Sequence, residues 1–386
     1  MRALPPITIT PAMLTGATSA EPSAGEAVWS AALQYGSGNR VISATTHRIY
    51  ESLKGKASTV TIVTGSSVIT WPNHGLAPDT QVAFATTGSL PSPLSTIQTY
   101  FVVADTANTF RISSNPGGAG PISITGAQSG VHTAGVSSNV NKAHDPTTDD
   151  GTWWLDVGPT NRWAMFDLLR NTGTTTTSPL TVSITPGQRV DSIGVVGMVA
   201  DAVTVTVKVA GSTVYTASAD LLNRPTSGWY DYFYGAFRYR QEFARFDLPP
   251  YTNAVITISL TKANGNVTCG GVVLGSSVYL GRTLHEAESD ALNFSKIDRD
   301  DFGTATLVPR RSVPRTVQSL RCRKSDVDRI LQLRDDLNAV PALWSGLDDQ
   351  DSGYFSALLI VGVYKRFTIT MDQPEDALIS LELEEV

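Results

Sequence analysis

The sequence has few of the features that mark membrane-spanning, nucleic-acid-binding or secreted proteins. It contains no run of about 18 apolar residues, so we expect no transmembrane helix. The start, MRALPPITIT, lacks a basic segment followed by an apolar one, so we expect no secretion signal and a soluble protein. The net charge of −6 provides no broad basic field, which argues against nucleic acid as a partner.

Cysteine and histidine are also scarce. The two cysteines, Cys269 and Cys322, lie far apart in the sequence, so we expect two buried thiols and no disulfide framework. The five histidines are scattered, and none lies in an HExxH, GxSxG or comparable motif. We therefore expect no catalytic site and no cofactor.

Two acidic segments contain carboxylates of the kind found in metal or glycosidase sites. Residues 144–150 read HDPTTDD, in which three carboxylates could hold a cation: Asp145, Asp149 and Asp150. The segment lacks the glycine-centred loop of an EF-hand, so a solvated loop is the favoured interpretation. A second acidic group could form a glycosidase pair or a charged turn, and the turn is favoured: Asp298, Asp300 and Asp301.

The residues that are abundant predict a mainly β fold with several domains. Only 17% of residues are charged, and Gly, Thr, Ser, Val and Pro occur in short alternating runs. Residues 57–143 hold only four charged residues, and turn signals separate their strands, which predicts a small inserted β-barrel-like domain. Residues 161–285 contain six strand candidates and predict a β-sandwich or jelly roll.

The C-terminal segment differs in charge from the rest. Residues 286–386 contain 19 acids and 12 bases, a net charge of −7, whereas the preceding residues have a net charge of +1. Within this segment, residues 325–328 fit a capping box, and apolar residues at helical spacing predict a helix over 326–338. The strands that follow alternate in polarity, so we expect a separate α+β docking domain.

Aromatic residues gather in two places. Trp153 and Trp154 are adjacent, and on a strand one would face a core while the other faces the surface. Residues 229–251 contain ten aromatics in 23 residues, and their alternation predicts a strand with two aromatic faces. These rings either fill a core or an interface between protomers, or they form a platform for glycan or another ligand. RNA is disfavoured by the acidic balance. The candidate ligand-binding residues of this stretch are Trp229, Tyr230, Tyr232 and Tyr234.

When residues 57–143 are set aside, the flanking segments form a recognisable order of features. Trp29 is followed by Tyr35-Gly36, a strand that contains Tyr50, an Asp-Pro loop, and Gly-Thr-Trp153-Trp154. This order resembles the chitin- and cellulose-binding modules of carbohydrate-binding family five/twelve. The resemblance implies a module of residues 1–56 plus 144–160. It also implies that one or two of four aromatic residues stack on sugar while the others hold a small core: Trp29, Tyr50, Trp153 and Trp154.

The inserted segment resembles a module that recurs in bacteriophage tail and virion proteins. The similarity spans residues 74–113 and rests on several fixed positions: His74, Gly75, Leu76, Val82, Phe84, Gly88, Leu90, Pro91, Tyr100, Val102, Asn108, Thr109, Phe110 and Ser113. Residues 156–167, 297–318 and 357–386 are similar to a protein encoded among the tail genes of long-tailed phages. These positions fix turns and fill a barrel, and they imply no chemistry.

The resemblance implies a structural protein of a phage tail tip or baseplate. Its partners would be other tail proteins, further copies of itself in a trimer or ring, and, through outward-facing loops, a host-surface glycan. The protein would be made in the host cytoplasm and located in the virion. Two competing hypotheses are a receptor-binding lectin that recognises host polysaccharide and a depolymerase.

Overall fold

The chain is mainly β and is built from several sheets, as expected from its composition. The computed structural model describes residues 1–104, 106–117, 120–136, 144–223, 228–235, 238–299, 301–348, 355–371 and 373–386. The end of the predicted insertion (residues 137–143), Asp300 and Phe237 lie outside the described residues. The chain divides into two compact units, of which unit 1 comprises residues 1–20 and 161–386 and unit 2 comprises residues 21–160.

Unit 2 contains a three-stranded antiparallel sheet. Its strand order is β11-β4-β3, and the strands are β3 (Arg40–Ser43), β4 (Arg48–Ser52) and β11 (Trp154–Pro159). The sheet is small, and four buried residues form its core: Tyr35, Val41, Tyr50 and Trp154. Because so few side chains fill this core, each of them carries a large share of its stability.

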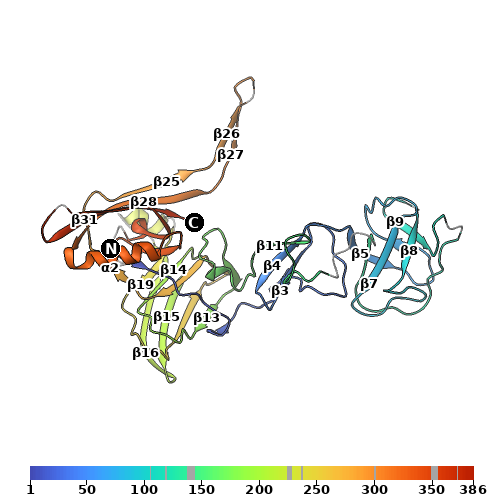
Figure 1. Ribbon diagram of the computed structural model, residues 1–386, viewed down its shortest axis with the longest axis horizontal. Coiled ribbons are helices and arrows are strands. Elements are labelled where there is room, and N and C mark those ends of the chain that lie inside the picture. The colour runs from blue at the N-terminus through green and yellow to red at the C-terminus, as the bar shows by residue number, and fades with distance from the viewer. Residues whose placement is uncertain are drawn as a thin grey trace. The chain divides into compact units, whose positions relative to one another are not determined.

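The rest of unit 2 is a closed six-stranded barrel (Figure 1). Its order is β10-β5-β6-β9-β8-β7, and it closes because β10 pairs with both β5 and β7. The strands are β5 (Ala57–Ile62), β6 (Ile69–Thr70), β7 (Gln81–Thr86), β8 (Thr99–Ala104), β9 (Thr109–Ser113) and β10 (His132–Val136). Large side chains, among them Phe84, Tyr100 and Phe110, fill its interior, so the barrel is a packed core.

His74, one of the fixed positions of the barrel sequence, is a buried residue whose ring bonds to two loops. Its Nδ1 accepts the backbone N–H of Leu76 at 3.0 Å, and its Nε2 lies 2.8 Å from the carbonyl oxygen of Thr106. The ring also packs edge-on against Phe110. The histidine therefore holds two loops of the barrel together and has a structural role.

One part of unit 1 is a β-sandwich. One layer is a five-stranded sheet of order β16-β15-β20-β13-β2, formed by β2 (Leu14–Ala17), β13 (Leu180–Ile184), β15 (Ala202–Val209), β16 (Ser212–Asp220) and β20 (Val255–Thr261). The other is a three-stranded sheet of β14 (Ser192–Val196), β19 (Phe243–Arg245) and β22 (Gly271–Gly275). A further pair joins β12 (Thr174–Thr177) to β21 (Asn266–Cys269). One apolar cluster lies between the layers and contains the buried thiol of Cys269.

The second part of unit 1 is an eight-stranded sheet. Its main order is β23-β1-β29-β30-β31-β28-β24, and β25 also pairs with β28. Its strands are β1 (Arg2–Leu4), β23 (Val278–Tyr279), β24 (Arg282–Thr283), β25 (Glu288–Asn293), β28 (Ser312–Arg323), β29 (Ala342–Ser345), β30 (Leu359–Thr370) and β31 (Asp376–Glu385). Helix α2 (Val327–Asp336) packs on one face of this sheet. The other face packs on the three-stranded sheet of the sandwich. Gly194 permits this second contact, because a Cβ there would lie 2.7 Å from Leu343.

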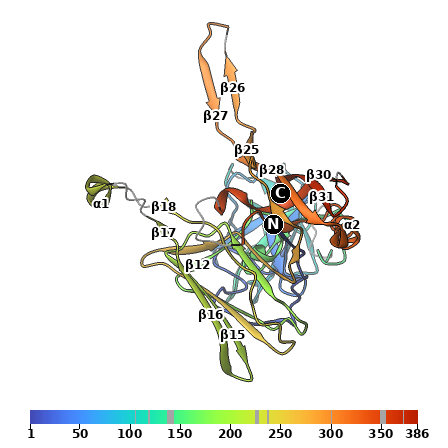
Figure 2. The ribbon, with the colours of Figure 1, turned by 90° about the vertical axis from the view of Figure 1, so that its left-hand side faces the viewer.

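Two segments of unit 1 project from its sheets (Figure 2). The first pairs β17 (Leu222–Asn223) with β18 (Arg238–Tyr239), and helix α1 (Trp229–Tyr234) lies between them in the sequence. The second is a ribbon of β26 (Lys296–Arg299) and β27 (Ala305–Val308), all of whose residues are exposed. Short 3-10 turns cover Ala164–Phe166, Lys324–Asp326 and Ser356–Leu358. No helix in the described part of the chain is long and apolar enough to cross a membrane.

The strand pairing differs from the predicted domain limits at two places. Residues 1–20, which the sequence assigned to the N-terminal module, lie in unit 1, where β1 pairs with β23 and β29 and β2 pairs with β13. The predicted limit at residue 285 separates β23 and β24 from the sheet that they join. Strands of two to four residues carry too little pattern to show such distant pairings.

Of the two elements predicted from a capping box and from alternating aromatic residues, the helix is confirmed and the strand is not. The helix expected over 326–338 is α2, and its buried residues are Val327, Ile330 and Leu333. The capping box is wrong, because a 3-10 turn precedes α2 and Asp326 makes no side-chain cap bond. The strand expected in residues 229–251 is wrong over Trp229–Tyr234, which form helix α1, although β18 and β19 follow in the same stretch. The rings of α1 meet at i,i+3 and i,i+4 spacing, as in the pairs of Trp229 with Tyr232 and Phe233.

Candidate functional site

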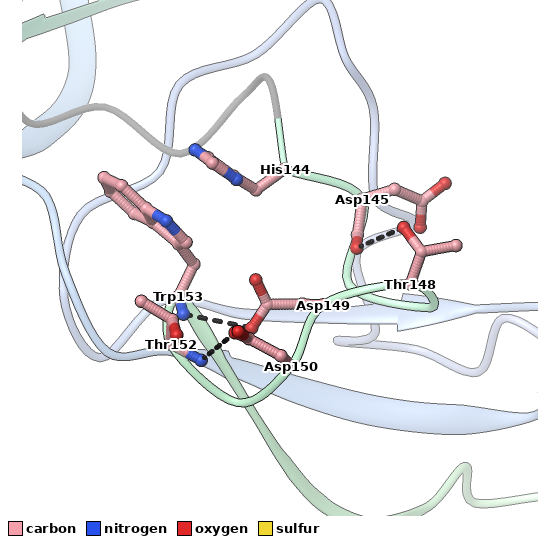
Figure 3. Close-up of a pocket in the computed structure, with 7 residues that line it drawn as sticks. All are labelled: His144, Asp145, Thr148, Asp149, Asp150, Thr152 and Trp153. Carbon is pink, nitrogen blue, oxygen red and sulfur yellow. Dashed lines mark hydrogen bonds between the residues drawn. The ribbon is translucent and has the colours of Figure 1, made fainter.

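A hollow of about 400 Å³ lies beside the paired tryptophans of unit 2 (Figure 3). It is open to solvent and is lined by His144, Asp145, Thr148, Asp149, Asp150, Thr152 and Trp153. The residues come from the loop that precedes β11, the segment HDPTTDDGTW. The hollow therefore combines one indole ring, one imidazole ring and three carboxylates.

The carboxylate of Asp149 shapes this loop. Its Oδ2 accepts three backbone N–H groups, from Gly151, Trp153 and Trp154, each at 3.0 Å. Gly151 has a φ of 88°, which favours glycine at the turn. The Asp149 carboxylate thus satisfies three backbone N–H groups of the loop and fixes the backbone of both tryptophans.

The other two carboxylates also close turns. Asp145 Oδ1 accepts the backbone N–H and the hydroxyl of Thr147, both at 2.8 Å, and Asp150 Oδ1 accepts the N–H of Thr152 at 3.0 Å. Hydrogen bonds from Thr152 hold the pKa of Asp150 below its usual range. Among the described residues, no group of three His, Cys, Asp or Glu side chains is arranged to hold a metal ion. The carboxylates of the described loop accept hydrogen bonds from the loop's own backbone and hydroxyl groups.

Trp154 points into the core of the three-stranded sheet. Only 2% of its surface is exposed, and its ring meets Tyr35 edge-on with centroids 5.4 Å apart. Its Nε1 donates a hydrogen bond to the carbonyl oxygen of His144 at 2.8 Å. Trp154 thus fills the core and anchors the loop that forms the hollow.

Trp153 lies on the other side and contacts the hollow. Its ring stacks on His144 with centroids 4.2 Å apart and planes 15° from parallel (Figure 3). The ammonium group of Lys54 lies 5.3 Å from the centroid of the same ring. Stacking and a cation–π contact therefore occupy the ring that the resemblance offered to a sugar.

The structure brings the four predicted aromatic residues of unit 2 together around one core. Tyr50 is buried and its hydroxyl lies 3.0 Å from Thr46 Oγ1, while Trp29 is half-buried against the same cluster. The Nε1 atom of Trp29 is buried and has no hydrogen-bond partner among the described residues. Three of these four residues thus serve the small core, and Trp153 is the member that lines the hollow.

The remaining predicted residues form a separate group in unit 1. Trp229, Tyr230, Tyr232 and Tyr234 all lie in α1, none of whose residues is buried. The alternative that these rings fill a core is wrong, although Phe243, later in the same aromatic stretch, is buried in the sandwich. Of the acidic group, Asp298 lies on β26 of the ribbon and Asp301 follows it, both are exposed, and Asp298 pairs with Lys296 Nζ at 2.7 Å.

Two residues that contact the Trp153 ring were not among the predicted site residues. His144 belongs to the acidic segment that we considered as a cation site, but nothing in the sequence indicated that it stacks on Trp153. Lys54 follows β4 and reaches Trp153 through a contact between residues far apart in the sequence, for which the sequence holds no signal. A search with this chain found no matching protein-family model and no matching curated protein.

Proposed function

We propose that the chain is a structural component of a phage tail tip or baseplate, in which it assembles with other tail proteins and with copies of itself. The proposal starts from the resemblance of residues 74–113 to a module of virion proteins. It assigns no catalytic role, so clearing of host envelope material in a zymogram would contradict it. In this role the packed barrel of unit 2 is a rigid display module.

The observation that carries the proposal is the apolar surface of the two projecting segments of unit 1. Helix α1 exposes five aromatic side chains, and the ribbon of β26 and β27 exposes Ile297 and Leu307, which pair across the strands on one face. Monomeric proteins rarely display such surfaces, because they promote association. A two-stranded ribbon is also only marginally stable alone in water. Neighbouring proteins in an assembly would cover both segments.

Gold labelling of phage particles tests the location. Antibodies raised against the full chain would be applied to purified particles of the phage or prophage that carries the gene and viewed by electron microscopy. We expect gold at the end of the tail. Label on the head, or particles that contain no peptide of this chain by mass spectrometry, would contradict the proposal.

A second candidate function, a lectin, is favoured by the hollow of unit 2. Aromatic rings and carboxylates are the groups that sugar sites use, and Trp153 lies among Asp145, Asp149 and Asp150. Against it, His144 stacks on the Trp153 ring, so a sugar would have to displace the imidazole or bind at the ring edge.

A glycan array probed with the full chain separates the two functions. A lectin would retain a host glycan and lose it in the Trp153→Ala variant, whereas Tyr251→Ala, an exposed aromatic of unit 1, would bind normally. Absence of binding to any host glycan would favour the structural role alone.

A further inference from the structure

The side chains of α1 form an exposed aromatic cluster. The exposed fractions are 80% for Trp229, 75% for Tyr230, 56% for Tyr232, 62% for Phe233 and 75% for Tyr234. Their rings meet each other within the helix, for example Trp229 with Phe233 at 6.3 Å and Tyr230 with Tyr234 at 5.3 Å. The cluster is thus ordered by its own ring contacts and still presents most of its surface to solvent.

The area of this cluster matches one side of a stable protein interface. A Phe, Tyr or Trp side chain can bury about 150–250 Å². At the exposures of α1, five such side chains offer on the order of 500–900 Å². A standard interface buries about 800 Å² on each partner. Covering α1 alone would therefore supply most of what one partner needs.

Unit 1 also carries an apolar cavity of about 490 Å³. It lies where the chain leaves β24 and enters β25, and it is lined by Thr283, Leu284, His285, Glu286, Ala287, Ser289, Leu347, Ala357 and Leu358. Its volume lies within the range of about 300–1,000 Å³ that is typical of ligand pockets. Its lining could accept aromatic rings, and Glu286 at its edge could accept a hydrogen bond from an indole N–H.

The charges of the two segments are opposite. By sequence, residues 222–240, which include α1, contain three arginines and Asp231, a net charge of +2, and Arg224 lies outside the described residues. Residues 283–290, which include most of the cavity lining, contain Glu286, Glu288 and Asp290. Asp290 pairs with Arg315 at 2.7 Å, so Glu286 and Glu288 supply the negative charge beside the cavity. Opposite charge steers two such surfaces toward each other and disfavours contact between like segments.

We propose that α1 of one copy docks into the cavity of a second copy, with Trp229 and Phe233 as the inserted rings. Because the inserted group and the cavity lie on different surfaces of the same unit, the contact is head-to-tail and can repeat until a ring closes. This inference rests on the proposed assembly function and names the surface through which copies of the chain associate.

Photocrosslinking of the full chain tests the contact directly. Trp229 would be replaced by p-benzoylphenylalanine, and the product would be irradiated in a mixture of ¹⁵N-labelled and unlabelled chains. We expect crosslinks between chains that map to residues 283–289 or 357–358. Crosslinks to other surfaces, or no crosslinks, would overturn the proposal.

Sedimentation velocity of matched variants measures how strongly the chains associate. Trp229→Ser with Phe233→Ser should weaken self-association by at least about 30-fold, the effect expected of hot-spot residues. Ala287→Trp, which fills the cavity, and Glu286→Lys, which reverses a charge at its edge, should weaken it as well. Tyr251→Ser, also an exposed aromatic of unit 1, should not.

The possible failures are distinguishable. A wild-type chain that remains monomeric at its highest soluble concentration refutes the contact. A chain that associates equally well in all variants also refutes it, but it leaves the assembly function in place. The location in the virion is decided separately by gold labelling.

Discussion

The two adjacent tryptophans should differ strongly in their contribution to stability. Replacing Trp154 by Ala removes the largest side chain from a core of four buried residues, for which about 3–5 kcal/mol is expected. The hydrogen bond from its Nε1 to the carbonyl oxygen of His144 adds about 1 kcal/mol. Replacing Trp153 removes a half-buried ring, which costs about 1 kcal/mol.

Hydrogen exchange followed by mass spectrometry measures this difference within the full chain. A gap of at least about 2 kcal/mol corresponds to about 30-fold faster exchange through opening of β3, β4 and β11 in Trp154→Ala than in Trp153→Ala. Peptides from β15 and β20 in unit 1 serve as the internal control. Trp154→Phe, which retains a ring against Tyr35 but loses the N–H donor, should fall between the two. Equal exchange in the two alanine variants would refute the assignment of Trp154 to the core and Trp153 to the hollow.

Three further predictions concern charged and titratable groups. Asp149→Ala leaves three backbone N–H groups without their acceptor and should destabilise the loop by about 2 kcal/mol, while Asp149→Asn should cost less because it keeps one oxygen acceptor; amide exchange at Trp153 and Trp154 measures both. Glu385 is buried and pairs with Arg170 and Arg311, so Glu385→Gln should lower the free energy of unfolding of unit 1 by about 3 kcal/mol. Glu384→Gln, which breaks a partly exposed pair with Lys365, should cost about 1 kcal/mol or less in the same urea titration. Burial lowers the pKa of His132 below 6.5, so the unfolded chain binds more protons just below that pH, and the barrel should lose stability as the pH falls through this range. His132→Asn should remove that part of the pH dependence in urea titrations on either side of pH 6.5.

The mainly β class followed from local information. Strands such as β15 and β20 have one face in a core and one toward solvent, so apolar and polar residues alternate along their sequences. Helix α2 was also predictable from local sequence, because its apolar residues Val327, Ile330 and Leu333 share one face. Elements of this kind need no knowledge of their partners to be predicted.

The errors arose where distant residues decide the structure. The first strand, of three residues, pairs with β29 more than 300 positions away, and no local pattern reveals such a pairing. In α1 the alternation of aromatic residues suggested a strand, but no neighbouring strand pairs with these residues in the described structure, and the rings meet along a helix instead.

The candidate site was partly predictable for the same reason. Adjacent tryptophans implied that one ring would be buried and the other would not, which the structure confirms for Trp154 and Trp153. The residues that cover the second ring were not predicted, because His144 reaches it only through the loop turns that Asp149 closes, and Lys54 is distant in the sequence.

A cryo-electron microscopy map of purified phage tails is the direct test of the proposed role. We expect copies of this chain at the tail end in a closed arrangement, with α1 of each copy seated at residues 283–289 of the next. A tail end without density for this chain, or one in which α1 remains exposed to solvent, would contradict it.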